Sequence, residues 1–301
     1  MTTASELLIL QRLRALGRTL GGARQGDVGA IHQARVATRR LREALPLVVD
    51  AGRARKLGRR VRGLTRALGP VRELDVVLHT LDALALASDV PADAVVCLRT
   101  VVVEERRRVH AAMVKGIADF SLEKLRRRAV AGARKHDAAL AAEGAPTRRR
   151  RADPASLAMA DRRAAKRAAA LAAAIDNAAG IYLPDRLHEV RIAVKKLRYA
   201  MEVARDLRGS RAAARIRTLK RAQELLGRMH DMEVLIARTR GVQGSPRASN
   251  LQLSDHLDLL VRHLENECRR LHGHYIASRG QLVAVCDYVA AFSLRHASPA
   301  A

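Results

Sequence analysis

We predict an all-α fold from three features of the sequence. Apolar residues recur at spacings of three and four along almost the whole chain, which is the period of an amphipathic helix. The helix-favouring residues Ala, Leu, Arg and Glu dominate, whereas the alternation typical of strands is missing and aromatic residues make up only 2%. With 301 residues, 49% of them hydrophobic, the chain can bury a sizeable core and is not disordered as a whole.

Six helices are predicted in the first half of the chain, with breaks where glycine or proline interrupts the apolar period. The first break falls at Gly21 and Gly22, a later one at Gly69 and Pro70, and another at Pro91. The expected helices span 4–18, 28–50, 53–68, 71–87, 91–116 and 119–142.

Six more helices are predicted in the second half, with breaks that include Gly180, Gly227 and Gly273. They span 154–179, 185–208, 211–226, 229–240, 250–272 and 275–294. An Arg- and Pro-containing linker is expected between the halves. The predicted organisation is a helical repeat over 1–145, a linker over 146–154 and a second helical repeat over 155–301, which together form one domain.

Two segments of the chain occur twice. Residues 31–45 read IHQARVATRRLREAL and residues 187–201 read LHEVRIAVKKLRYAM, at an offset of 156. A second pair, LGPVRELDV at 68–76 and LGRMHDMEV at 226–234, follows at an offset of 158. Matched blocks in the same order predict two copies of one helical unit. We therefore expect two tandem helical bundles with a pseudo-two-fold relation around a basic central cleft.

Each copy of the first segment has an apolar face and a basic face when drawn as a helix at about 100° per residue. The basic faces contain His32, Arg35, Arg39 and Arg42 in the first copy and His188, Arg191, Lys195 and Arg198 in the second. Lys195 replaces Arg39, so the charge is kept while the residue changes. Cations one helical turn apart, about 5.4 Å, form a line that suits a polyanion better than a single phosphate.

A basic helix face is often simply exposed to solvent, and that interpretation stays open. An anion site is favoured because neither basic face contains a carboxylate and because Val36 and Ile192 lie just beyond the histidines, on the side away from the core. His32 and His188 are candidates for phosphate donors, with capping of a backbone group as the alternative. No metal-binding or catalytic motif surrounds either histidine.

The charge of the chain favours a phosphate-rich partner. Lys and Arg number 56 against 30 Asp and Glu, which gives a net charge of +26, and most of the cations are Arg, which binds phosphate in a bidentate fork. Two Phe, four Tyr and no Trp are too few for the stacking platform of single-stranded nucleic-acid binders. Three cysteines without CxxC spacing predict neither a disulfide framework nor a cysteine metal cluster. No secretory signal or membrane span is predicted.

At these residues the sequence resembles the CHAD family, an α-helical domain named for its histidines. The family pattern of HxxR, a basic run and Leu-Arg stands here as His32-x-x-Arg35 with Arg39-Arg40-Leu41-Arg42, and as His188-x-x-Arg191 with Lys195-Lys196-Leu197-Arg198. The resemblance covers nearly the whole chain, because the family is itself built of two four-helix repeats. It implies binding of inorganic polyphosphate in a basic central groove and a cytoplasmic location at polyphosphate granules.

Carried over residue by residue, the resemblance implies eight polyphosphate contacts and a set of weaker ones. The eight are His32, Arg35, Arg39, Arg42, His188, Arg191, Lys195 and Arg198. The weaker candidates are Arg40, Arg59, Arg62, Arg66, Lys196, Arg217 and Lys220. Two positions depart from the family pattern. Glu73 stands where the family usually has Asp, and Pro46, with Glu202 as its counterpart, would kink the first signature helix and shift its basic row.

The carboxylates that follow the two Leu-Gly pairs are expected in first helical turns, where they complement the helix dipole and orient the arginines. They are Glu73, Asp75, Asp231 and Glu233. A metal site built from His230, Asp231 and Glu233 is the less favoured alternative, because the further histidines of metal phosphohydrolases have no evident place here.

The function predicted from these features is polyphosphate binding without catalytic residues, cofactor or metal. The alternative is a basic helical protein that binds nucleic acid nonspecifically, and weak nucleic-acid binding is also expected beside polyphosphate. A phosphotransfer or phosphatase enzyme would need a carboxylate or metal constellation that the sequence does not offer. The family often carries a triphosphate-hydrolase-like domain, for which 301 residues leave no room, so a separate polyphosphate-metabolising enzyme is an expected partner.

Overall fold

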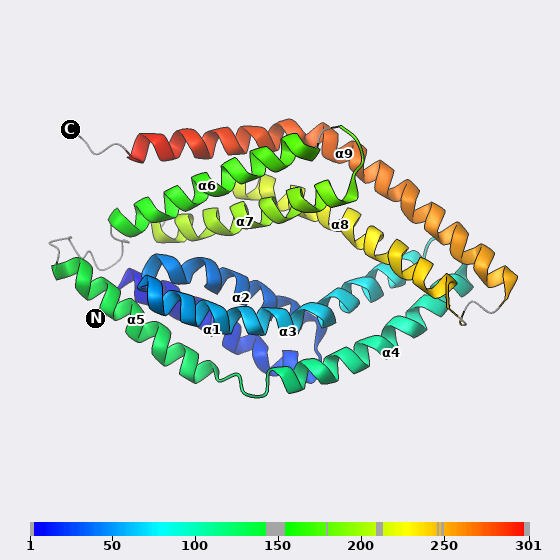
Figure 1. Ribbon diagram of the computed structural model, residues 1–301, viewed down its shortest axis with the longest axis horizontal. Helices are drawn as coiled ribbons and strands as arrows, with labels where there is room; N and C mark the ends of the chain where they lie inside the picture. The colour runs from blue at the N-terminus through cyan, green and yellow to red at the C-terminus, as the bar shows by residue number, and fades with distance from the viewer. Residues whose placement is uncertain are drawn as a thin grey trace.

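Nine α-helices and no strand make up the described part of the computed structural model, which comprises residues 3–142, 154–178, 180–208, 213–245, 247 and 250–297. The helices are α1 (Ala4–Gln25), α2 (Val28–Val48), α3 (Ala51–Leu84), α4 (Ala92–Gly116), α5 (Leu122–Ala142), α6 (Pro154–Ala178), α7 (Pro184–Arg208), α8 (Ala214–Gln243) and α9 (Leu251–Ala297). The prediction of an all-α fold is confirmed. Figure 1 shows α1 to α5 on one side of the molecule and α6 to α9 on the other.

The first three helices begin at side-chain caps that are readable in the sequence. The side chains of Thr3, Asp27 and Asp50 accept hydrogen bonds from backbone N–H groups three residues on. Gly26 ends α1 with φ 89°, a left-handed conformation that glycine adopts without strain. The helix α1 therefore passes through the expected break at Gly21 and Gly22.

Three other predicted helix breaks are wrong. Residues 53–68 and 71–87 form the single helix α3, 211–226 and 229–240 form α8, and 250–272 and 275–294 form α9. Pro70 removes one backbone hydrogen bond from α3, which costs about 3 kcal/mol in a helix interior. Buried Leu68 and Val71 on either side outweigh this cost through packing. Figure 1 shows α3 and α9 bending rather than ending.

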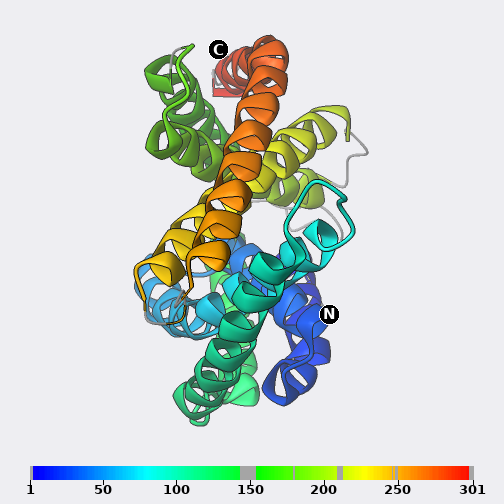
Figure 2. The same cartoon turned by 90° about the vertical axis from the view of Figure 1, so that its right-hand side faces the viewer.

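The buried apolar residues form three clusters; the first includes Val203 and Leu207 of α7, and the third is shared by both halves of the chain. The first cluster lies mainly among α1, α2, α5 and the first part of α3, and the second among α6, α7, the first part of α8 and the last part of α9. The third joins Leu81 of α3 and Leu98 of α4 to Leu235 of α8 and Leu264 of α9, all fully buried. Seen from this end, the α8–α9 hairpin lies against the α3–α4 hairpin (Figure 2).

Ion pairs also connect the two halves. Arg12 of α1 pairs with Asp206 of α7, and Arg163 Nε of α6 lies 2.9 Å from Glu43 Oε2 of α2. The predicted linker 146–154, with Arg148 to Arg151, lies outside the described residues except for Pro154, which begins α6. The repeat boundaries at 1–145 and 155–301 stay a prediction. None of the described helices has the length and apolarity needed to cross a membrane.

Candidate functional site: a basic cavity between two helix pairs

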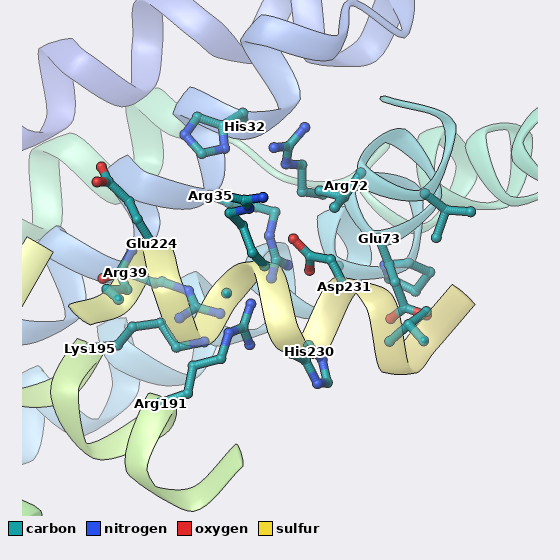
Figure 3. A pocket seen from close by; sticks show the side chains of 18 residues that line it. His32, Arg35, Arg39, Arg72, Glu73, Arg191, Lys195, Glu224, His230 and Asp231 are labelled. Atoms are coloured by element: carbon teal, nitrogen blue, oxygen red, sulfur yellow. The ribbon is translucent and has the colours of Figure 1, made fainter. Parts of the chain in front are cut away.

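A cavity of about 710 Å³ lies between α2 and α3 of the first half and α7 and α8 of the second. Its polar lining includes His32, Arg35, Arg39, Arg72, Glu73, Arg191, Lys195, Gln223, Glu224, Arg228, His230 and Asp231. Figure 3 shows the labelled arginines and the lysine converging on Asp231 from opposite sides. Five of the eight main candidates therefore line one cavity, and they come from both copies of the repeated segment.

The first half contributes a buried arginine that approaches the backbone of α3 closely. Arg35 Nη1 donates a hydrogen bond of 3.0 Å to the carbonyl oxygen of Thr65. The same nitrogen would lie only 3.1 Å from a Cβ at position 69, so Gly69 makes room for the guanidinium. Burial and the charges of Arg39 and Arg72 lower the pKa of Arg35 to about 10. Its charged form is thus destabilised by its own neighbours.

The second half contributes Arg191 and Lys195, which are also largely buried. Arg191 Nε is buried and has no hydrogen-bond partner within the part of the chain that the structure describes. Burial, followed by the charges of Arg191, Arg39 and Arg35, lowers the pKa of Lys195 to about 7. About half of the Lys195 side chains are therefore uncharged at neutral pH while the cavity holds no anion.

Sequence reasoning missed Arg72 and Asp231 as parts of the site. Both come from the second repeated block, whose carboxylates we expected in first helical turns, but α3 and α8 run through and place them in mid-helix. Burial raises the pKa of Asp231 even though Arg191, His230 and Arg72 act in the opposite direction. The sequence did carry a signal for these two residues. The second repeated block follows the first at nearly the same distance in both halves, which places Arg72 beside α2 and Asp231 beside α7.

The two signature histidines occupy different surroundings. His32 lines the cavity with part of its side chain exposed, and partial burial, followed by the charges of Arg72 and Arg35, lowers its pKa. His188 is not part of the cavity lining; its Nδ1 lies 3.2 Å from Nδ1 of His230 on α8. Burial lowers the pKa of His188, followed by the charges of His230 and Arg191.

The last members of the two basic rows lie outside the cavity lining. Arg198 has a side chain that is 9% exposed, and its Nη1 and Nε donate to Glu202 Oε1 at 2.5 Å and to Gln223 Oε1 at 2.9 Å. The structure thus places Arg198 in an internal network, away from a ligand in the cavity. Its counterpart Arg42 is half-buried, and burial and the nearby charge of Arg62 lower its pKa.

None of the weaker candidates lines the cavity. Arg40 Nε lies 3.0 Å from Glu202 Oε2, which ties α2 to α7, and Lys220 Nζ lies 3.6 Å from Glu224 Oε1. The other weaker candidates are exposed side chains: Arg59, Arg62, Arg66, Lys196 and Arg217. Pro46 does not end α2, which continues to Val48.

The described structure does not bring His230, Asp231 and Glu233 together as a metal site. Within the described residues no group of three or more His, Cys, Asp or Glu side chains is placed to hold a metal ion. His230 Nδ1 lies 3.8 Å from Glu233 Oε2, and Glu233 Oε1 accepts a hydrogen bond of 2.8 Å from Tyr182. Asp231 instead faces the cavity cations (Figure 3).

The cavity can bind an anion with charge-assisted hydrogen bonds. Guanidinium groups and Lys195 donate several such bonds, and an anion between them would offset the burial and nearby positive charge that lower the pKa values of Arg35, Arg191 and Lys195. These groups come from helices that are fixed by packing on both sides, so the donors are positioned in advance.

Comparisons with known proteins identify relatives of this arrangement. The CHAD domain family model matches residues 7–240. The structure is similar to the crystal structure of the CHAD domain from the plant Ricinus communis, with a TM-score of 0.59 and 21% identity over 99% of this chain and 92% of that one. It is also similar to PptA from Streptomyces chartreusis, with a TM-score of 0.54 and 20% identity over 98% of this chain and 100% of that one. A search of curated proteins finds no significant match.

Proposed function

The chain belongs to the CHAD domain family, a family associated with polyphosphate, and on this premise we propose that it binds inorganic polyphosphate in the cavity between α2, α3, α7 and α8. The observation that carries the proposal is the convergence of Arg35, Arg39, Arg191 and Lys195 from both halves. Burial, with nearby cations adding to it, lowers the pKa values of Arg35, Arg191 and Lys195, so a bound polyanion would stabilise their charged forms.

The arrangement favours a polymer over a single phosphate. Cations on α2 and α7 follow one another at a spacing of about one helical turn, 5.4 Å, and α3 adds Arg72. One phosphate group accepts hydrogen bonds from two or three such donors. A chain of linked phosphates can meet cations from both helices at once.

The proposed role is binding without catalysis. Guanidinium groups hold charge and donate hydrogen bonds, but they do not act as general bases. We extend the proposal to targeting or organising polyphosphate granules, and to cooperation with a separate polyphosphate-metabolising enzyme. Duplex nucleic acid is the alternative ligand, favoured only by the net charge of +26.

The decisive test removes the four converging cations. Changing Arg35, Arg39, Arg191 and Lys195 together to Ala should lower polyphosphate affinity by at least about a hundredfold. Each substitution removes a charge-assisted hydrogen bond between the protein and the phosphate chain. Binding is measured by titration calorimetry at fixed salt, and helicity by circular dichroism. In cells, a fluorescent fusion of this variant should leave the granules.

A matched control removes the same number of charges elsewhere. Changing the exposed Arg107, Arg108, Arg127 and Arg128 to Ala should alter the affinity by no more than about threefold. Equal losses in both variants would assign binding to bulk charge and contradict the proposal. Displacement of polyphosphate by duplex DNA at equal phosphate concentration would instead favour the nucleic-acid alternative.

A further inference from the structure

The cationic face of α2 continues beyond the cavity, toward the end of the helix. Arg39 lines the cavity, and Arg42 lies about one turn further on. Burial lowers the pKa of Arg42, and the charges of Arg62, Arg39 and Arg66 act in the same direction against that of Glu43, so Arg42 lies close to all three of these guanidinium groups. The cationic path therefore runs from the cavity wall onto the surface of α2 and α3.

The three arginines on this path are available to a ligand. No ion pair involves Arg42, Arg62 or Arg66 among the residues for which the structure gives side chains. Arg62 and Arg66 are exposed, and Arg42 is half-buried. We call these three residues the α2–α3 exit.

The matching surface of the second half is neutralised by carboxylates. Arg198, the counterpart of Arg42, is held by Glu202, which stands where α2 has Pro46. Glu224, the counterpart of Arg66, lines the cavity and pairs with Lys220, the counterpart of Arg62. The α2–α3 exit thus has three cations without an ion pair among the described residues. The matching surface of the second half has the cations Arg198 and Lys220 together with the carboxylates Glu202 and Glu224.

We propose that polyphosphate longer than the cavity leaves it along the α2–α3 exit, so that Arg42, Arg62 and Arg66 give the protein a preference for long chains. This inference rests on the proposed function of the cavity. A phosphate chain that left past α8 would meet Glu224 and lose affinity through repulsion. Along α2, the step from Arg39 to Arg42 carries the cationic row about 4.5 Å beyond the cavity, where Arg62 and Arg66 of α3 add further cations for phosphates outside it.

The test compares two ligand lengths on one protein. The probes are tripolyphosphate, which is short enough for the cavity, and a long-chain polyphosphate of defined length. In the wild-type protein the long chain should bind more tightly per molecule and show a steeper dependence on salt, because it neutralises more cations. Changing Arg42, Arg62 and Arg66 to Gln should lower long-chain affinity by about tenfold and flatten the salt slope by about 2, while tripolyphosphate affinity stays within about twofold.

A control variant removes three cations from the corresponding surface. Changing Lys196, Arg217 and Lys220 to Gln should leave the preference for long chains unchanged. Glu224→Arg should increase long-chain affinity, because it replaces the carboxylate on α8 with the residue type that its counterpart Arg66 has in the α2–α3 exit. The double variant Arg62→Gln with Arg66→Gln, which touches only exposed side chains, should show most of the effect if the triple variant does not fold.

Each further result bears on one of the two proposals. Equal losses in the α2–α3 exit variant and its control would overturn the exit, and so would a loss of tripolyphosphate binding in the exit variant or no loss in either. A wild-type protein that binds neither probe would overturn the proposed function itself. The two failures are thus distinguishable.

Discussion

The helix pairs α2–α3 and α7–α8 carry the same repeated blocks but use the last basic position differently. Arg42 in α2 has Pro46 four residues on, whereas Arg198 in α7 has Glu202 at that spacing. Residues four apart face each other on a helix, so Arg198 acquires an internal partner and Arg42 does not. We expected Pro46 to act through a kink, but its larger effect is that Arg42 lacks the i+4 carboxylate that Arg198 has in Glu202.

The comparison shows how one repeated segment serves two purposes. Glu202 receives Arg198 from its own helix and Arg40 from α2, so it connects the halves behind the cavity. In the first copy the equivalent position is Pro46, which makes no such connection, and Arg42 has no ion pair within the part of the chain that the structure describes. The second copy therefore contributes more to cohesion and the first more to the ligand surface.

The largest effect is expected from removing the charge that connects the two copies. Glu202→Gln leaves buried Arg198 without its counter-ion, which should lower the free energy of unfolding by about 3 kcal/mol. The control Glu224→Gln breaks an exposed pair and should change it by less than about 1 kcal/mol. Both are measured by urea unfolding at neutral pH. Identical midpoints for the two variants would show that Glu202 does not hold the copies together.

A second expected difference concerns pH, because the second copy has Lys195 where the first has Arg39. The pKa of Lys195 is about 7 in the free protein, and a bound polyanion raises it. Below pH 7 the lysine is already charged and affinity is highest. Above pH 7 binding must take up a proton, so affinity should fall by up to about tenfold per pH unit.

The matching variant is Lys195→Arg, which keeps the charge at all these pH values. Its affinity for long-chain polyphosphate should be nearly constant between pH 7 and pH 9, as measured by calorimetry in buffers of different ionisation enthalpy. A pH dependence that survives in this variant would assign the proton to another group.

The smallest effects are expected at the two matched glycines. A Cβ at position 227 would lie 3.9 Å from Arg191 Nε, an ordinary contact, so Gly227→Ala should stabilise α8 by about 1 kcal/mol without affecting binding. At position 69 the Cβ would lie 3.1 Å from Arg35 Nη1, so Gly69→Ala should displace the guanidinium and weaken polyphosphate binding by about threefold. Thermal unfolding measures the stability of each variant, and calorimetry measures its affinity for polyphosphate. Equal changes in the two variants would contradict the expected difference between positions 69 and 227.

Much of the cavity could be predicted from the sequence because the repeat carries it. The spacing of Arg35 and Arg39, and of Arg191 and Lys195, places each pair on one helix face, and the structure brings all four to one cavity. The pairing of Arg198 with Glu202 was also readable from its i, i+4 spacing. Because we treated each basic row as a single unit, we did not distinguish Arg198, which pairs with Glu202, from Arg191 and Lys195, which line the cavity.

Other features depend on contacts between distant parts of the chain. Gly69 and Pro70 read locally as a break, yet the burial of Leu68 and Val71 carries α3 through them. The partnership of Arg40 with Glu202, which are 162 residues apart, has no local signal. Arg72 and the mid-helix position of Asp231 follow only once α3 and α8 are known to be continuous.

The third apolar cluster has a consequence for how the molecule comes apart. Its residues come from both hairpins, so detaching either half would expose Leu81 and Leu98 on one side and Leu235 and Leu264 on the other. Loss of one half would therefore withdraw support from the other, and we expect the duplicated segments to melt in one cooperative step. The duplication is visible in the order of the amino acids, but the shared cluster predicts that the molecule unfolds as an undivided whole.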